Sequence, residues 1–590
     1  MVRVPTLRRV MSPQLPPNFH ASLWQQVPER PSQWHALDTQ FGNGQAFLET
    51  LLAWQADPQA PSQLFYTAFT EQAPDNLVPQ LSKNCFGLLP GIHRICFANS
   101  QVKLNLCVGP FSVNFKEIDI AADSIHIANF LEIDPRSIAR LSKLGTRIRW
   151  SAMNDEALAQ LKASGFQLDT LGSSATYQPH WPIKTALRST DIQAPESKRK
   201  AIVIGAGLAG AAVAYSLAQR GWQVEVIDQH TQTGGGASGL PAGIFATHVS
   251  PDNNVLSRIT RDGVRATIER AASLLKRGEE WDLSHLVEHR YSGKRELPPS
   301  PVWPEAGLEW SAEANEVHKQ MAGLNKETLA LWHPMAGWIQ TQSLVKAQLS
   351  HPNISCRFET KVSQLIRQAS GWQLIDNNNQ VVAQADHVII ANAHACQALL
   401  NGIQIVEQAS GKPRPQIPIT HLRGQVTFGP MHSLNQDLRS KLPRVPVNGH
   451  GSFIGNLPDL QNNSESPYWI VGSSFQRYEF DTTVREEDQR SNLKQWAELM
   501  PAWHDEILEN ADVSKTHGWA GVRAALPDRL PAVGAFQHPD FEGLQVCTGM
   551  GARGISWSVL CGELLASQLN HEPLPMAASL AKLMAAARFG

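Results

Sequence analysis

The sequence has few cysteines, no long apolar run and almost no net charge, and each shortage excludes a class of protein. Its seven cysteines include no pair spaced as Cys-x-x-Cys, so we expect neither a disulfide framework nor a metal site. Free cysteines of this kind suit a reducing cytoplasm. No stretch approaches ~18 consecutive apolar residues, the length that a membrane helix needs, so no membrane span is expected.

Neither the net charge nor the N-terminal segment points to a particular partner or to a targeting signal. The net charge of −2 does not require a nucleic-acid partner, although a local basic patch remains compatible with it. Residues 1–10 carry three arginines with no apolar run behind them, which is not the pattern of a secretory signal. The composition, 42% hydrophobic and 18% charged, is that of an ordinary globular protein.

The length of 590 residues exceeds what one core accommodates, so two or three globular units are expected. Residues 185–199 are polar and charged, contain a proline and show no apolar periodicity, which predicts a linker. We therefore expect a first domain over residues 1–184 and a second over residues 200–590.

A glycine-rich turn follows the linker directly. The apolar run 201–204 predicts a buried parallel strand, and it leads into Gly205, Gly207 and Gly210 before an alanine-rich helix. Gly205 permits a tight turn, Gly207 lets the backbone approach a pyrophosphate, and Gly210 lets helix and strand pack closely. A second strand ends at Asp228, where a carboxylate accepts hydrogen bonds from ribose hydroxyls. The sequence predicts a dinucleotide site.

Two further segments resemble the D-amino-acid-oxidase-like flavoprotein family. One is Gly234–Gly239 after the second strand; the other comprises the C-terminal stretches 521–534 and 545–554. The resemblance implies FAD, with the first segment beside the flavin diphosphate and the last helix directed at the flavin ring. The cofactor-binding residues then expected are Gly205, Gly207, Gly210, Asp228, Gly236, Ala237, Ser238, Gly549, Gly551, Arg553 and Gly554.

The first domain carries a different loop. Asp38 is followed by the turn glycines Gly42 and Gly44 and an apolar helix, and Glu71 follows a second expected strand. This pattern resembles an S-adenosylmethionine site, in which Glu71 would hold the ribose. An ordinary β-turn-α unit without a ligand is the alternative interpretation.

Together the two domains resemble the MnmC family of bifunctional tRNA-modifying proteins. The motifs that carry the resemblance are 41–44, 178–182, 236–239, Gly337-Trp338 and 423–425, with the C-terminal stretches above. It implies two α/β domains: a Rossmann-like methyltransferase domain, then an FAD-binding Rossmann domain with an inserted antiparallel substrate sheet. The implied partner is tRNA with a modified wobble uridine.

The implied reactions act on one base in sequence. The flavin domain removes the carboxymethyl group from 5-carboxymethylaminomethyl-2-thiouridine to give 5-aminomethyl-2-thiouridine. The first domain then methylates the exposed amine to 5-methylaminomethyl-2-thiouridine.

The first domain departs from the family pattern. Gln40 stands where the family loop has an additional glycine, and Ala128 stands where a carboxylate would accept the proton of the amine. Methyl transfer needs a neutral, aligned amine. We therefore expect weak or absent methyl transfer, although His126 and Glu132 are candidate substitutes.

Three arginines are candidates for the oxidase site. Arg523 is expected to anchor the substrate carboxylate through a bidentate guanidinium, and Arg423 borders the active site in the family. Arg553 is expected beside the flavin ring. Gly521 occupies the position of a flavin-linking cysteine in sarcosine-oxidase relatives, so FAD should be held non-covalently.

Binding to tRNA needs basic side chains, and the densest basic run lies in the first domain. It consists of Arg136, Arg140, Lys143, Arg147 and Arg149. Phosphate contacts are one interpretation of the run and a solvated helix face is the other.

Two alternative functions remain open at this stage: an FAD-dependent oxidase of a small amine or amino acid, and a non-enzymatic RNA-binding scaffold. The sequence leaves the oligomeric state undetermined.

Overall fold

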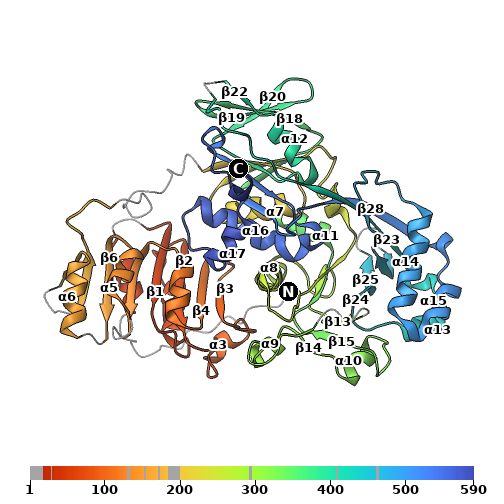
Figure 1. Ribbon diagram of the computed structural model, residues 1–590, viewed down its shortest axis with the longest axis horizontal. Helices are drawn as coiled ribbons and strands as arrows, with labels where there is room; N and C mark the ends of the chain where they lie inside the picture. The colour runs from red at the N-terminus through yellow and green to blue at the C-terminus, as the bar shows by residue number, and fades with distance from the viewer. Residues whose placement is uncertain are drawn as a thin grey trace. The chain divides into compact units, whose positions relative to one another are not determined.

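The computed structural model describes residues 18–27, 30–128, 133–151, 154–169, 173–183, 199–290, 296–406, 409–459 and 464–590. The chain divides into two compact units, Met1–Ala194 with Ser567–Ser579, and Pro195–Ala566 with Leu580–Gly590 (Figure 1). The expected linker, apart from Arg199, and the candidate Glu132 lie outside the described residues.

The first unit is built on an eight-stranded sheet of order β3-β4-β2-β1-β5-β6-β8-β7. Its strands are β1 (Gln33–Asp38), β2 (Gln63–Thr70), β3 (Gly91–Phe97), β4 (Val102–Val108), β5 (Ala122–Ile127), β6 (Ser142–Trp150), β7 (Phe166–Leu168) and β8 (Ser174–Tyr177). Its helices are α1 (Phe19–Trp24), α2 (Gln45–Ala56), α3 (Pro79–Ser82), α4 (Phe111–Asn114), α5 (Pro135–Arg140) and α6 (Asp155–Ala163).

The middle of this sheet is parallel, and its direction of growth reverses between β1 and β5. All seven residues of β4 are buried, as expected of a parallel strand covered on both faces. In such sheets the loops at the carboxyl ends of the strands on either side of the reversal form the ligand site.

The second unit contains a six-stranded sheet of order β17-β10-β9-β21-β30-β29, in which only the β29–β30 pair is antiparallel. The strands are β9 (Lys200–Ile204), β10 (Gln223–Ile227), β17 (Ile354–Arg357), β21 (His387–Ile390), β29 (Ala532–Ala535) and β30 (Leu544–Thr548). Helices α7 (Leu208–Ala218) and α16 (Gly554–Leu569) cross each other closely, since a Cβ on Gly562 would lie 2.6 Å from the carbonyl carbon of Ala212 (Figure 1).

A nine-stranded mixed sheet forms the rest of the core of this unit. Its strands are β13 (Leu286–His289), β14 (Ala312–Glu313), β15 (Ala330–His333), β23 (Thr420–Pro430), β24 (Val447–Gly449), β25 (Gly451–Asp459), β26 (Ser464–Gly472), β27 (Gln476–Arg477) and β28 (His517–Ala525). Helix α14 (Glu486–Leu499) covers it, and its Trp496 stacks on Phe453 and Trp469 at ring distances of 5.1 and 5.3 Å.

Smaller elements complete the second unit. Two small sheets contain β11 (Gly243–Phe245), β12 (Trp281–Asp282) and β16 (Gly337–Ile339), and β18 (Val362–Gln368), β19 (Gly371–Asp376), β20 (Val381–Ala385) and β22 (Gln404–Ile405). The remaining helices are α8 (Val255–Leu274), α9 (Glu305–Leu308), α10 (Glu316–Met321), α11 (Thr341–Leu349), α12 (Cys396–Asn401), α13 (Gln436–Lys441), α15 (His504–Asn510) and α17 (Ala578–Met584). The first two residues of α17 are assigned to the first unit.

The α/β class predicted from the sequence is confirmed, and element boundaries agree within a few residues. The strand predicted at 201–204 is β9, and the helix expected after the C-terminal glycine-rich stretch is α16, which begins at Gly554. Strand β26 ends at Gly472, and the chain leaves the ladder before it re-pairs with β23 as β27. No helix in the described ranges combines the length and apolar character that crossing a membrane requires.

Gly210 fixes the packing of α7 on β9. A Cβ built on Gly210 would lie 1.8 Å from the carbonyl oxygen of Gly205, a backbone atom that cannot rotate away. Gly210→Ala should therefore destabilise the protein by about 1–3 kcal/mol, the usual cost of overpacking, and lower its flavin content.

Chemical denaturation followed by fluorescence measures the change. Gly402→Ala is the matched control, since its nearest neighbour would lie 3.5 Å away and its φ of −83° suits alanine. Equal stability of the two variants would contradict the assignment of Gly210 as a packing glycine.

Candidate active site

The glycine-rich turn between β9 and α7 is as tight as the sequence predicted. Gly205 has a φ of +114°, and a Cβ there would lie 2.7 Å from the carbonyl oxygen of Ala391. Gly207 is the N-cap of α7, and a Cβ there would lie 2.9 Å from Ser238 Oγ. The turn is thus packed tightly on one side by the neighbouring strand and on the other by the predicted diphosphate segment.

Asp228 lies at the end of β10, but its carboxylate is already engaged. Oδ2 accepts from the Ala206 amide at 2.6 Å, and Oδ1 accepts from the His230 amide at 2.8 Å and contacts His230 Nδ1 at 2.7 Å. The acid therefore also braces the turn. His230 is a partner that the sequence pattern did not indicate.

The segment Gly236–Ser238 reaches the same turn. Ser238 Oγ accepts from the Leu208 amide at 2.9 Å, within the first turn of α7. A Cβ on Gly236 would meet nothing within 4 Å, so the backbone here borders open space. Ala237 and Ser238 are half-buried beside it.

The C-terminal glycines form a second turn in the same unit. Gly549 and Gly551 have φ values of +81° and +55°, and the turn leads through Arg553 into α16 at Gly554. A Cβ on Gly554 would lie 3.7 Å from Leu208 Cδ1, which brings the starts of α16 and α7 together. Arg553 lies over the Trp557 ring, with 5.4 Å between the guanidinium carbon and the ring centroid.

One acceptor at the first turn has no partner. Asn392 Oδ1 is buried without a hydrogen bond, and the Cα of Asn392 would lie 3.1 Å from a Cβ on Gly205. An unpaired buried acceptor is costly unless a ligand donates to it. With the open backbone at Gly236, this fits a bound dinucleotide whose hydroxyl groups can donate.

The register of β23 and β28 separates the two candidate arginines. Leu422 pairs with Arg523, and Arg423 pairs with Val522. Paired residues share a face and successive residues alternate, so Arg523 and Arg423 point to opposite faces of the sheet.

The face that carries Arg523 is turned toward the predicted flavin segments. Gly521 and Ala525 share this face by alternation. A Cβ on Gly521 would lie 3.2 Å from Ala237 Cα, and one on Gly551 would lie 3.4 Å from Ala525 Cβ. Arg523 is therefore brought together with both glycine-rich segments.

Arg523 has no counter-ion among the described residues. Its guanidinium lies 5.9 Å from the Phe475 ring centroid, and its Nη2 would lie 2.9 Å from a Cβ on Gly424. Burial lowers the pKa of Arg523, because the charged form loses water without gaining an anion. A carboxylate arriving at this guanidinium would supply that missing stabilisation.

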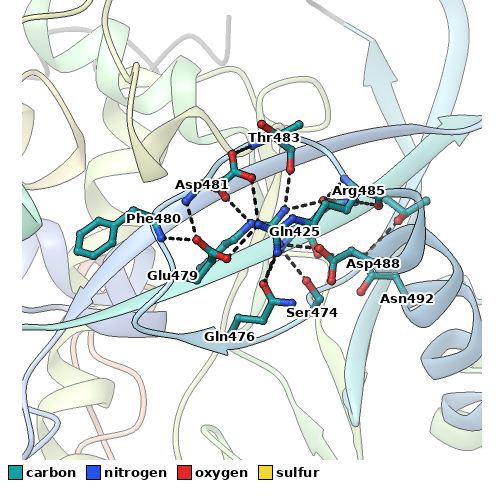
Figure 2. Close-up of polar contacts among 12 residues, drawn as sticks. Gln425, Ser474, Gln476, Glu479, Phe480, Asp481, Thr483, Arg485, Asp488 and Asn492 are labelled. Carbon is teal, nitrogen blue, oxygen red and sulfur yellow. Dashed lines mark hydrogen bonds and ion pairs between the residues drawn. The ribbon is translucent and has the colours of Figure 1, made fainter.

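Arg423, by contrast, is fully buried, and its donors all have partners in the protein, including Asp488 and Thr483, which are labelled in Figure 2. Nη1 contacts Asp488 Oδ2 at 2.6 Å, and Nη2 donates to Gln425 Oε1 at 3.0 Å and to the Thr483 carbonyl at 2.7 Å. Nε donates to the Asp481 carbonyl at 2.5 Å. This geometry makes Arg423 a bracing residue of the sheet and leaves no donor directed at a substrate.

The first unit contains a cavity of about 370 Å³ at the carboxyl ends of its strands, where the sheet reverses direction. Its lining residues come from the loops after β1, β2, β4 and β5: Thr39, Gln40, Gly42, Phe69, Thr70, Glu71, Gly109, Phe111, Ala128 and Ile133. A Cβ on Gly42 would meet nothing within 4 Å, whereas Gly44, with a φ of +86°, caps α2 and packs on Leu81 and Phe41.

Asp38 does not line this cavity. It is buried and accepts from the Tyr66 hydroxyl at 2.9 Å, from the Gln40 amide at 3.0 Å, and contacts His126 Nδ1 at 3.3 Å. Burial, and next the charge of Asp38, raise the pKa of Tyr66 well above its usual value. Asp38 thus shapes the loop, while Gly42 and Glu71 border the cavity itself.

The basic run of the first unit is split by the fold. Arg140 donates to the carbonyls of Ile118 and Phe115, and Lys143 pairs with Asp123 at 2.6 Å. Arg136, Arg147 and Arg149 are exposed, the first on α5 and the other two on β6. The basic run therefore does not form one continuous helix face, because its residues are divided between α5 and β6.

Comparison with known proteins defines the class. The family described as FAD dependent oxidoreductase matches residues 200–568. The L-proline dehydrogenase from P.horikoshii has a similar fold, with a TM-score of 0.50 at 16% identity over 66% of this chain and 98% of that one. The second unit is thus an FAD-dependent oxidoreductase, as the motifs predicted.

Curated relatives identify the family. The tRNA 5-methylaminomethyl-2-thiouridine biosynthesis bifunctional protein MnmC of Polaromonas naphthalenivorans (strain CJ2) is 37% identical over 580 residues, 92% of this chain and 88% of that protein. The MnmC protein of Paracidovorax citrulli (strain AAC00-1) is 35% identical over 94% of this chain and 92% of its own length. The chain belongs to the MnmC family.

Three residues near these sites escaped the sequence interpretation. Asn392 follows a strand that carries no motif, His230 lies outside the glycine pattern, and Phe475 lies in a connection after β26 that matches no motif. Asn392 is identified by a buried oxygen without a hydrogen bond, His230 by its contact with Asp228, and Phe475 by its exposure to solvent. All three properties depend on the tertiary fold, so the sequence alone does not reveal them.

The Arg423–Asp488 pair should carry more stability than its exposed neighbours. Asp488→Asn removes the one carboxylate that contacts the fully buried Arg423 guanidinium among the described residues, so we expect a loss of about 3 kcal/mol in the free energy of unfolding. Urea denaturation measures it.

Glu486→Gln is the matched control on the same helix. Glu486 pairs with Arg490, and both side chains are more than half exposed, so the change should have little effect. If both variants unfold at the same urea concentration, the buried pair does not brace the sheet.

Proposed function

We propose that the chain oxidatively removes the carboxymethyl group from 5-carboxymethylaminomethyl-2-thiouridine at the wobble position of tRNA. The relatives are named for the biosynthesis of 5-methylaminomethyl-2-thiouridine in tRNA, and they resemble this chain over nearly its whole length. The observation that carries the proposal is the uncompensated Arg523 on the sheet face turned to the flavin segments. The departing group carries a carboxylate, which a guanidinium binds in bidentate fashion.

The glycine-rich elements would hold FAD non-covalently. Residues Gly205, Gly207 and Gly210 would bring α7 to the diphosphate, and Gly236–Ser238 would lie alongside it. Asp228 would meet the ribose. Gly549, Gly551, Arg553 and Gly554 would border the flavin ring. Gly521 offers no nucleophile for a covalent link.

Bound FAD supplies a two-electron oxidation of the carbon next to the amine nitrogen, and hydrolysis of the resulting imine releases glyoxylate. Arg523 would hold the carboxylate and so fix that carbon in position. The glycine-rich segments on either side of Arg523 would exclude bulk water, which strengthens the ion pair.

The first unit would contribute more to binding than to chemistry. Its cavity is retained where a methyl donor would sit, bordered by Gly42 and Glu71, and S-adenosylmethionine is the ligand the family suggests. Ala128 lines this cavity without a carboxylate to take up the proton of the amine. The exposed Arg136, Arg147 and Arg149 are then the candidates for phosphate contacts, and a tRNA substrate would place the protein in the cytoplasm.

Mass spectrometry of wobble nucleosides tests the function. After incubation with carboxymethylaminomethyl-bearing tRNA, we expect conversion to 5-aminomethyl-2-thiouridine. Adding S-adenosylmethionine should yield little 5-methylaminomethyl-2-thiouridine, because the proton acceptor is missing. Unchanged tRNA, together with turnover of glycine, sarcosine or proline, would instead identify a small-amine oxidase.

The anchor role of Arg523 predicts a specific kinetic defect. Arg523→Lys should raise KM at least tenfold, because an ammonium cannot reproduce the two parallel hydrogen bonds of the guanidinium. Steady-state oxidation of the modified tRNA measures it.

Arg367→Lys serves as the control. Arg367 lies in a separate small sheet, over the Trp372 ring at 5.5 Å, and should leave KM unaltered. An unaltered KM in Arg523→Lys would transfer the anchor role to Arg553.

A further inference from the structure

Exposed aromatic side chains are concentrated in one short segment of the second unit. Of the aromatic residues that the structure describes, four are more than a third exposed: Trp181, Phe475, Tyr478 and Phe480. Three of the four fall within six residues. An aromatic ring left in water forgoes the stabilisation that burial would give it, so this concentration points to a binding surface.

Two arginine cations lie near the Phe475 ring. The guanidinium carbons of Arg477 and Arg523 each lie 5.9 Å from the Phe475 ring centroid. Arg477 pairs with Leu422 across β23, as Arg523 does from the other side, so both arginines share one face of the sheet. Neither has a carboxylate partner in the described parts of the chain.

The opposite face holds this arrangement in place. Gln476, between Phe475 and Arg477, accepts from Arg485 Nη1 at 3.0 Å and from Arg423 Nη1 at 3.4 Å (Figure 2). Alternation therefore directs Arg477 away from the polar network, and the Phe475 ring lies near the Arg477 guanidinium. The hydrogen bonds of Gln476 therefore fix the backbone on which Phe475 and Arg477 are placed.

We propose that Phe475 and Arg477 form a stacking platform for an unpaired base of the tRNA anticodon loop, next to the carboxylate anchor Arg523. The inference rests on the proposed function and adds the surface that selects a nucleic acid over a free amine. Proteins recognise RNA loops by stacking splayed bases on aromatic rings and guanidinium planes and by neutralising the adjoining phosphates.

The chemistry favours RNA over a protein partner. The ring is flanked by two cations that lack counter-ions, and a nucleotide offers a base for the ring and a phosphate for Arg477. The nearby acids Glu479 and Asp481 are already neutralised by Arg485, at 2.9 and 3.0 Å, so they do not repel the phosphate strongly.

Flavin reduction by modified tRNA under anaerobic conditions tests the platform. Phe475→Ala should raise the half-saturating tRNA concentration about tenfold, within the range found for losing one base–aromatic stack. The limiting rate of reduction at saturation should stay as in the wild type, since Phe475 takes no part in the chemistry. Phe475→Trp should retain affinity within about twofold.

Arg477→Gln probes the phosphate contact separately. It should weaken tRNA binding and reduce the slope of log affinity against log salt concentration by about 0.7, the value for one contact to single-stranded nucleic acid. Leu508→Ala, at an apolar residue on α15 that is about half exposed, is the control and should change neither quantity.

The outcomes separate this inference from the function on which it rests. A wild-type protein that tRNA does not reduce would contradict the proposed function. A wild-type protein that tRNA reduces, combined with an unaltered half-saturating concentration in Phe475→Ala, would overturn the platform alone.

Discussion

The buried ion pair between Arg423 and Asp488 is the interaction on which the substrate side of the second unit depends. It joins β23 to the start of α14, and the same guanidinium also takes up the backbone carbonyls of Asp481 and Thr483. A charge removed from water in this way is tolerated only when nearly all its donors are satisfied. The segment between β27 and α14 is consequently held along its length, and the opposite face is left free for Arg523 and Phe475.

A steric constraint has the equivalent role at the cofactor side. Gly205, Gly207 and Gly210 each lie where a Cβ would come within 3 Å of another atom, so the turn can form only without side chains. That closeness brings the start of α7 to Ser238, and the start of α16 meets it at Leu208. Two helix N-termini, each a favourable site for negative charge, are thereby brought close together in one unit.

The sequence predicted local geometry well and side-chain partnerships poorly, for a physical reason. Glycine spacing and apolar runs reflect short-range sterics, so β9, α7 and the two glycine-rich turns were predictable. The contrast between Arg423 and Arg523 was not predictable. The two residues looked alike in sequence, and only the pairing of Leu422 with Arg523 reveals that they occupy opposite faces. Likewise, the carboxylates of Asp38 and Asp228 are used within the protein by Tyr66 and His230, which no motif indicates.

In the proposed function, the first unit keeps a cavity for a ligand but lacks the carboxylate that methyl transfer would need. The cavity depends on strand order and on the loops after β1, β2 and β4, features that the sheet itself maintains through its buried core. In the proposed function, proton removal would depend on one carboxylate at the position of Ala128, whose side chain is a methyl group. His126 does not replace it simply, because its Nδ1 faces Asp38 and its Nε2 lies 3.4 Å from Ser151 Oγ, while the cavity is lined by other residues. A single missing carboxylate would leave the packing intact, so the unit would keep its fold and its exposed arginines even if methyl transfer were slow. A tRNA that still needs a large surface for binding would be sufficient reason for the unit to be retained.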